Sequence, residues 1–322
     1  MRYTALGASG LEVPVLFLGC GNFGGLGSPP ELFGLGDDKE TAFAVLDAAL
    51  AADVRMLDTA NSYGGGVSEE WIGDWLVSRG VRDEIMLTTK VASPMGPAAQ
   101  DRGLSRRHIR QQIEASLRRL RTDRVELYLA HEPDGSTPIA ETVAAFAELV
   151  AEGKIAHYGL SNYDSAGLDQ AVAAVAELGV PGPADLQNGY SLLDRSASAA
   201  FETANRAGIG CTAYSPLAGG LLTGKYRAGQ EPPAGTRLAL RPTAFSNLSM
   251  DDAFPAISRL AAAADGYGVP LTTLALAWVL TDPTVSALLI GPRSAAHVTA
   301  MCAAVDIQLT EAQRAELVGL AT

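Results

Sequence analysis

The run RMLDTANSYGGG, residues 55–66, begins with a short apolar segment that is followed directly by Asp58 and, five residues later, by Tyr63. Residues 55–57 have the length and composition of a buried strand, and the glycines that end the run are typical of a loop. A strand in a hydrophobic core gains nothing from a charge at its tip. In a (β/α)8 barrel, however, the C-terminal strand ends form the floor of the active site, where catalytic side chains meet.

The same arrangement occurs twice more along the chain. Two apolar runs, residues 85–89 and 125–130, are followed directly by Lys90 and His131. Their type and position predict that both side chains lie with Asp58 and Tyr63 at one end of a barrel.

Strands and helices alternate through most of the sequence. The eight segments that we predict as strands are residues 15–18, 55–57, 85–89, 125–130, 155–160, 185–187, 209–213 and 287–290. Apolar residues at helical spacing occur between them, and Ser68 and Pro138 are predicted to open two of these helices. Eight βα units in 322 residues favour a closed barrel over an open sheet. We therefore predict an α/β fold, a (β/α)8 TIM barrel, as a single domain over residues 1–322.

Three regions lie outside this repeat. Residues 1–14 contain a turn between two extended segments and predict a β-hairpin that caps the bottom of the barrel. Residues 217–247 form a long Gly/Pro-rich loop after the seventh strand, and its position predicts a lid. Residues 251–266 and 310–320 predict extra C-terminal helices.

Composition limits the class of protein. The net charge is −12, from 36 acidic and 24 basic residues, which argues against binding to nucleic acid. Cys20, Cys211 and Cys302 are few and widely spaced, so neither a disulfide framework nor a metal site is expected. The N-terminus lacks the apolar stretch of a signal peptide, and no apolar run approaches the length of a membrane span, so we expect a cytoplasmic protein with no membrane partner.

Residues 19–24 match the pattern G-x-G-x-x-G of dinucleotide-binding folds. That pattern requires a helix that begins at once, but GLGSPP follows here and the first helix is predicted only near Asp38. We interpret these glycines as a strand end at the barrel mouth.

The four ionisable groups make a coherent site for carbonyl reduction. The pKa of tyrosine is ordinarily near 10, and an ammonium group at Lys90 is expected to lower that of Tyr63 and make it a proton donor. Asp58 is the expected counter-ion of Lys90, and His131 is suited to donate a hydrogen bond to a substrate oxygen. Each residue alone also has a structural explanation, such as an ion pair or a turn cap. Because all four are predicted to meet at one end of the barrel, a catalytic role is favoured over these structural ones.

The sequence resembles the aldo-keto reductase superfamily, above all its bacterial and potassium-channel β-subunit-like branches. Four segments carry this resemblance beside Lys90 and His131, and they are residues 58–64, 159–162, 187–188 and 214–225. It implies NADPH-dependent reduction of an aldehyde or ketone, a small-molecule carbonyl substrate. In this scheme Tyr63 is the acid, assisted by Asp58, Lys90 and His131.

The resemblance also implies which residues contact NADPH or NADP+. Ser161, Asn162 and Gln187 match positions that hold the nicotinamide carboxamide, and Tyr214 matches the aromatic residue that stacks on the ring. The other expected contacts, from the first-strand loop to the pyrophosphate and adenosine segments, are Gly21, Asn22, Phe23, Asp58, Ser215, Pro216, Leu217, Gly220, Lys225, Arg237, Gly291, Arg293 and His297. The guanidinium of Arg293 suits a 2′-phosphate.

The sequence departs from the family pattern near the adenine. His297 and Met301 replace the usual Gln and Asn, and Ala300 replaces a Glu. The preference between NADPH and NADH is therefore left open. Two other functions also remain open: a non-catalytic NADP(H)-binding regulatory subunit, and a reductase of nucleotide-linked deoxysugars. A basic pocket near Lys225, Arg237 and Arg241 would favour the second.

Overall fold

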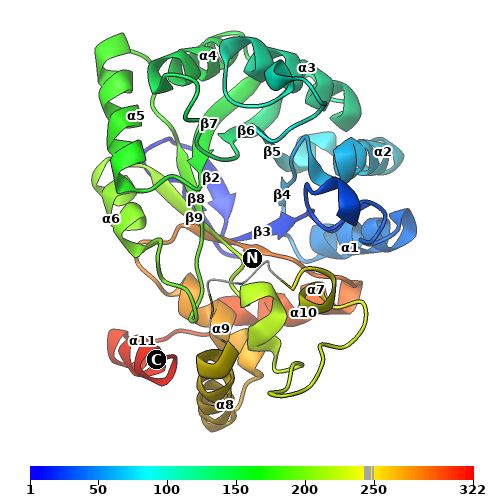
Figure 1. The fold of residues 1–322 in the computed structure, drawn as a ribbon, viewed down its shortest axis with the longest axis vertical. Helices are drawn as coiled ribbons and strands as arrows, with labels where there is room; N and C mark the ends of the chain where they lie inside the picture. The colour runs from blue at the N-terminus through cyan, green and yellow to red at the C-terminus, as the bar shows by residue number, and fades with distance from the viewer. Residues whose placement is uncertain (243–247, 249) are drawn as a thin grey trace.

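A closed barrel of eight parallel strands forms the centre of the computed structural model, which describes residues 1–242, 248 and 250–322. The strand order is β10-β3-β4-β5-β6-β7-β8-β9, so that β10 and β3 pair and close the barrel (Figure 1). These strands are β3 (Leu16–Gly19), β4 (Met56–Asp58), β5 (Met86–Val91), β6 (Val125–Ala130), β7 (Ile155–Ser161), β8 (Asp185–Gly189), β9 (Gly210–Tyr214) and β10 (Ala287–Ile290). The predicted (β/α)8 barrel is confirmed.

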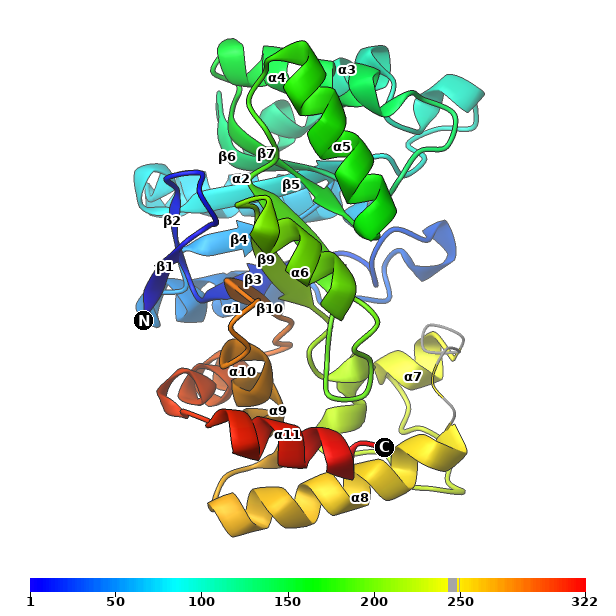
Figure 2. The ribbon, with the colours of Figure 1, turned by 90° about the vertical axis from the view of Figure 1, so that its left-hand side faces the viewer.

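Helices surround the barrel. They are α1 (Lys39–Ala51), α2 (Val67–Arg79), α3 (Arg106–Leu120), α4 (Ile139–Ala151), α5 (Ser165–Leu178), α6 (Ser198–Arg206), α7 (Arg237–Leu240), α8 (Met250–Tyr267), α9 (Leu271–Leu280), α10 (Ala295–Cys302) and α11 (Glu311–Leu320). Their apolar sides pack on the strands, as Ile109, Ile113 and Leu120 of α3 do. The extra C-terminal helices predicted from the sequence are α8 and α11, which lie together outside the ring (Figure 2).

A two-stranded hairpin closes the bottom of the barrel. Its strands, β1 (Tyr3–Ala5) and β2 (Glu12–Pro14), pair antiparallel. Leu6 and Val13 are fully buried and pack with the inward-facing side chains of the barrel. In Figure 2 the hairpin lies on the left, whereas α7 lies on the right, at the opposite end of the strands. The predicted capping hairpin is therefore confirmed.

Two details of the predicted elements differ. Asp58 and Lys90 lie within β4 and β5 rather than after them, because the hydrogen-bonded ladders continue through both residues. Ser68 does not open α2: the helix begins at Val67 after Gly66. The Ser68 hydroxyl instead donates to the Cys20 carbonyl oxygen at 3.0 Å, which ties α2 to the end of β3.

The predicted loop of residues 217–247 contains a short 3-10 helix, Ala218–Thr223, and α7. Residues 243–247 lie outside the described part of the chain. Among the described residues, no single helix is long and apolar enough to cross a membrane. Helices α8 and α9 reach that length and apolarity only together, and the break between them bends by 89°.

Candidate active site

Lys90 and Asp58 form a buried ion pair at the C-terminal end of the barrel. Each side chain is 1% exposed, and Lys90 Nζ also donates to the Thr59 carbonyl oxygen at 2.8 Å. Burial alone would lower the pKa of Lys90, but the Asp58 carboxylate and the Tyr63 hydroxyl together outweigh burial, and the pKa is raised. The pair therefore favours the cationic form of Lys90.

Tyr63 lies beside this pair, at the start of the short 3-10 helix Tyr63–Gly66 that follows β4. Its hydroxyl is 3.5 Å from Lys90 Nζ, which also lies 5.1 Å from the ring centre. The expected lowering of the Tyr63 pKa is wrong as a net effect. Burial raises the pKa of Tyr63 above its usual value, and the Lys90 ammonium only partly offsets that increase. Tyr63 is therefore a protonated phenol that can lose its proton beside a cation.

His131 packs edge-on against Tyr63. The ring centres are 5.6 Å apart at an interplanar angle of 75°. Burial, with a further contribution from the nearby Lys90 charge, lowers the pKa of His131 to about 3. The imidazole is therefore neutral at any ordinary pH. Its Nδ1 is buried without a hydrogen-bond partner in the described structure.

Residues behind the ion pair fix it in place. Gln187 of β8 donates from Nε2 to the second oxygen of Asp58 at 2.9 Å. On the outer side of β5, the Thr89 hydroxyl donates to Glu69 at 2.5 Å, and Arg119 donates to the other Glu69 oxygen at 2.7 Å. Glu69 is fully buried, so this three-residue cluster ties β5 to α2 and α3 beside Lys90.

Three of these four residues line a cavity of about 760 Å³ at the barrel mouth. They are Asp58, Tyr63 and His131, whereas Lys90 is buried behind them and bonded to Asp58. All but one of the predicted coenzyme contacts also line it: Gly21, Asn22, Asp58, Ser161, Asn162, Gln187, Tyr214, Ser215, Pro216, Leu217, Gly220, Lys225, Arg237, Gly291, Arg293 and His297. The exception is Phe23, which is 1% exposed and packs in the hydrophobic core.

Polar side chains on one wall of the cavity are bonded to one another. The Tyr214 hydroxyl donates to Asn162 Oδ1 at 2.6 Å, and Asn162 Nδ2 donates to the His131 carbonyl oxygen at 2.8 Å.

Three residues on or next to this wall have unusual backbone conformations. Asn162 has φ 64°, Ser215 has φ 53° and Ala218 has φ 46°, which are unusual values for residues other than glycine. Such backbone conformations are concentrated at binding and catalytic sites.

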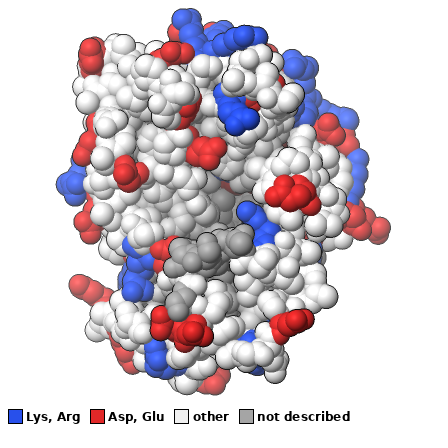
Figure 3. Space-filling view, viewed as in Figure 1, with Lys and Arg blue, Asp and Glu red and all other residues white. Residues whose placement is uncertain are grey.

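The opposite part of the cavity is basic. Lys225, Arg237, Arg241 and Arg293 line it, and the Arg237 Nε is buried without a partner in the described structure. Burial, with the neighbouring Arg241 charge, lowers the pKa of Arg237. Figure 3 shows basic atoms that border the hollow near the centre of this face. A buried guanidinium N–H without a partner, among other cations, fits an anionic ligand such as a diphosphate.

Sequence reasoning did not anticipate the part that Glu132 and Asp37 take in the site. Glu132 lines the cavity beside His131, and its position in the sequence was the available signal. Asp37 accepts a hydrogen bond from Arg293 at 3.0 Å although 256 positions separate them, and no local pattern indicates this pair. Within the described ranges, no group of three or more His, Cys, Asp or Glu side chains is placed to hold a metal ion.

A parallel (β/α)8 barrel with a Tyr–Lys–Asp–His group beside a basic cavity is the architecture of a barrel oxidoreductase. The aldo/keto reductase family model matches residues 16–321, and the chain belongs to that family.

Several relatives match nearly the whole chain. The "Uncharacterized oxidoreductase YrpG" of Bacillus subtilis is 38% identical over 96% of this chain and 92% of its own. A "Probable voltage-gated potassium channel subunit beta" of Arabidopsis thaliana is 34% identical over 95% and 92%. The "L-glyceraldehyde 3-phosphate reductase" of Escherichia coli is 31% identical over 90% and 84%. The chain is thus an oxidoreductase of the aldo/keto reductase family.

Proposed function

We propose that this chain reduces the carbonyl group of a small aldehyde or ketone to an alcohol, with NADPH as coenzyme and Tyr63 as proton donor. One observation carries the proposal: the Tyr63 hydroxyl lies 3.5 Å from the Lys90 ammonium, which is itself paired with Asp58. When bound, the reduced coenzyme supplies a hydride to the carbonyl carbon.

The side chains supply the rest of the chemistry. Tyr63 transfers its proton to the carbonyl oxygen, and the Lys90 ammonium stabilises the phenolate that remains. Asp58 keeps Lys90 charged inside the barrel, and solvent returns the proton to Tyr63. His131 is neutral, so it acts as a hydrogen-bond donor toward the carbonyl oxygen rather than as an acid.

The residues that line the cavity fit a phosphorylated coenzyme. Lys225, Arg237 and Arg241 would face its diphosphate, and the unpartnered Arg237 Nε is a donor that such a group would satisfy. Ser161, Asn162 and Gln187 would hold the carboxamide, and the flat ring of Tyr214 would pack on the nicotinamide.

The test is NADPH oxidation with a panel of aldehydes and ketones. Tyr63→Phe should lower kcat/KM by about 10²–10⁴-fold while NADPH binding stays within roughly twofold, because only the proton donor is lost. The matched control is Tyr3→Phe, since Tyr3 is an exposed tyrosine of the β1–β2 hairpin. Activity that survives Tyr63→Phe would exclude the proposed mechanism.

A regulatory role is the second candidate, and it is favoured by the similarity to the Arabidopsis protein named as a probable potassium channel β subunit. Tight NADPH binding with no turnover of any carbonyl substrate would support it. A third candidate is a reductase of nucleotide-linked deoxysugars. It is supported by the basic lining of the cavity at Lys225, Arg237 and Arg241, which suits the diphosphate of such a substrate. A nucleoside-diphosphate ketosugar that is reduced more efficiently than simple aldehydes would favour that substrate class.

We further propose that residues 1–322 form one domain located in the cytoplasm. The pairing of β10 with β3 supports the first point, because it joins the two ends of the chain in one sheet. Limited proteolysis that yields two stable fragments would contradict it.

A further inference from the structure

Arg293, the residue expected to receive a 2′-phosphate, already has protein partners. Its Nε donates to Asp37 Oδ1 at 3.0 Å, and its Nη1 donates to the Gly235 carbonyl oxygen at 3.1 Å. The Arg293 side chain is 39% exposed, whereas that of Asp37 is 4% exposed. The guanidinium therefore faces the cavity with a buried carboxylate against its inner edge.

The backbone of Asp37 is fixed on both sides. Its N–H donates to the Asn22 carbonyl oxygen at 2.7 Å, and its own carbonyl oxygen accepts from the Gly24 N–H at 3.2 Å. The second carboxylate oxygen, Oδ2, is buried and has no partner among the described residues. Burial raises the pKa of Asp37, and Arg293 opposes that effect. Asp37 thus depends on Arg293 for stabilisation of its charge.

Among the described residues, the other cations that line the cavity have no carboxylate partner like Asp37. Lys225, Arg237 and Arg241 have no ion pair within the described part of the chain, so their charge is available to a diphosphate. Next to Arg293, His297 Nδ1 accepts the Arg293 backbone N–H at 3.3 Å. Ala300 and Met301, which also line the cavity, offer no charged group.

We propose that Asp37 is a specificity-determining residue that weakens recognition of the 2′-phosphate, so that the chain uses NADH as well as NADPH. This inference rests on the proposed function, since it concerns the coenzyme of that site. A 2′-phosphate near Arg293 must share the guanidinium with Asp37 and meets its negative charge. NADH lacks that phosphate and pays no such penalty.

The test compares the Kd values of NADPH and NADH by fluorescence titration of the wild type and Asp37→Asn. Asn keeps the shape and one acceptor oxygen but removes the charge. NADPH should bind about tenfold more tightly to Asp37→Asn, and NADH should change by less than roughly twofold. Asp38→Asn is the matched control, because Asp38 carries the same charge one residue away and caps α1 through the Thr41 N–H. It should leave both Kd values unchanged.

The outcomes separate this inference from the proposed function. If both coenzymes bind but Asp37→Asn leaves their ratio unchanged, or weakens NADPH, the role of Asp37 is wrong and the proposed function stands. If neither coenzyme binds to the wild type, both are overturned. If Asp37→Asn fails to fold, the Kd of NADPH is measured instead for Arg293→Met, with Asp37 left intact. A loss of NADPH affinity below about threefold supports prior neutralisation by Asp37, and a loss of about tenfold or more overturns it.

Discussion

Gln187 donates a hydrogen bond from Nε2 to Asp58 Oδ2 at 2.9 Å, although 129 positions separate the two residues. Strand β8 thereby holds the carboxylate that Lys90 of β5 neutralises. Besides its proposed contact with the nicotinamide, Gln187 therefore also orients Asp58, the counter-ion of Lys90.

Gln187→Glu should be more damaging than Gln187→Leu. Leu leaves one buried Asp58 oxygen unpaired, which should lower the free energy of unfolding by about 1–3 kcal/mol. Glu keeps the size of the side chain but adds a second carboxylate beside a single ammonium, so kcat should fall further. Thermal unfolding and carbonyl reduction by both variants check this order. Equal kcat values would show that the charge at position 187 does not act on Asp58 and Lys90.

His131 should not contribute to the pH dependence of activity. Because its pKa is about 3, the imidazole is neutral on both sides of pH 6.5, the ordinary value. The profile of kcat/KM between about pH 5 and 8 should therefore have the same shape in the wild type and in His131→Asn. The variant should be slower by roughly tenfold to a hundredfold, because the donor geometry changes. A limb near pH 6.5 that disappears in His131→Asn would contradict a neutral imidazole.

Asp185 should make stability depend on pH. It is fully buried inside the barrel, it accepts from the Thr212 hydroxyl at 2.8 Å, and burial raises its pKa to about 8. The folded state therefore binds a proton that the unfolded state releases near pH 4. Stability from this group is present below that pH and is lost as the pH rises to 8, at up to about 1.4 kcal/mol per unit.

Asp185→Asn should remove this loss. Relative to the wild type, its free energy of unfolding should increase between pH 4 and 8, and the difference should vanish near pH 4. Denaturant unfolding across this range measures it. Asp123→Asn, at a side chain that is 87% exposed, is the control and should show no such trend. A constant difference between Asp185→Asn and the wild type would mean that folding does not raise the pKa of Asp185.

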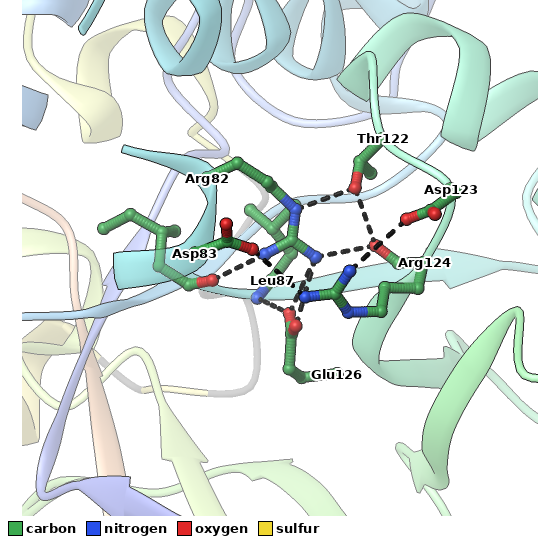
Figure 4. A network of polar contacts seen from close by, with 8 residues as sticks. Arg82, Asp83, Leu87, Thr122, Asp123, Arg124 and Glu126 are labelled. Atoms are coloured by element: carbon green, nitrogen blue, oxygen red, sulfur yellow. Dashed lines mark hydrogen bonds and ion pairs between the residues drawn. The ribbon is translucent and has the colours of Figure 1, made fainter. Parts of the chain in front are cut away.

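Arg82 should stabilise the fold without affecting catalysis. Its guanidinium donates to the Thr122 hydroxyl at 2.8 Å and to Glu126 at 3.1 Å, and Glu126 accepts from the Leu87 N–H at 2.7 Å (Figure 4). Arg82→Met should cost about 2–4 kcal/mol, because the half-buried Glu126 loses its cation. Arg124→Met, at a neighbouring arginine that is 50% exposed, should cost less than about 1 kcal/mol. Chemical denaturation gives both values, and kcat should stay unchanged in both variants.

The barrel and its four ionisable residues could be predicted because each signal is local. A strand such as Val125–Ala130 is a continuous apolar run, and its bounds are those predicted. The residue that follows it, His131, reaches the barrel mouth by topology alone. The ends of strands were predicted less accurately: β5 was expected to end at Thr89, but its hydrogen bonds to β6 continue to Val91.

Two properties of the site could not be predicted because they depend on distant parts of the chain. The pKa of Tyr63 reflects its burial in the folded chain, which outweighs the single Lys90 charge considered from the sequence. The pairs Gln187–Asp58 and Arg293–Asp37 join residues more than a hundred positions apart, and each partner sits in a different βα unit. Charge type alone does not indicate which carboxylate a given cation meets.

The hairpin that fills the bottom of the barrel has a kinetic consequence. Leu6 and Val13 block that end, so the coenzyme and the carbonyl compound of the proposed reaction share the cavity at the other end. A carbonyl compound that contacts Tyr63 first would stand in the path of the nicotinamide to the floor of that cavity. Binding should therefore be ordered: the coenzyme binds before the carbonyl compound and dissociates after the alcohol product. Product inhibition by NADP+ should accordingly be competitive with NADPH and not with the carbonyl compound.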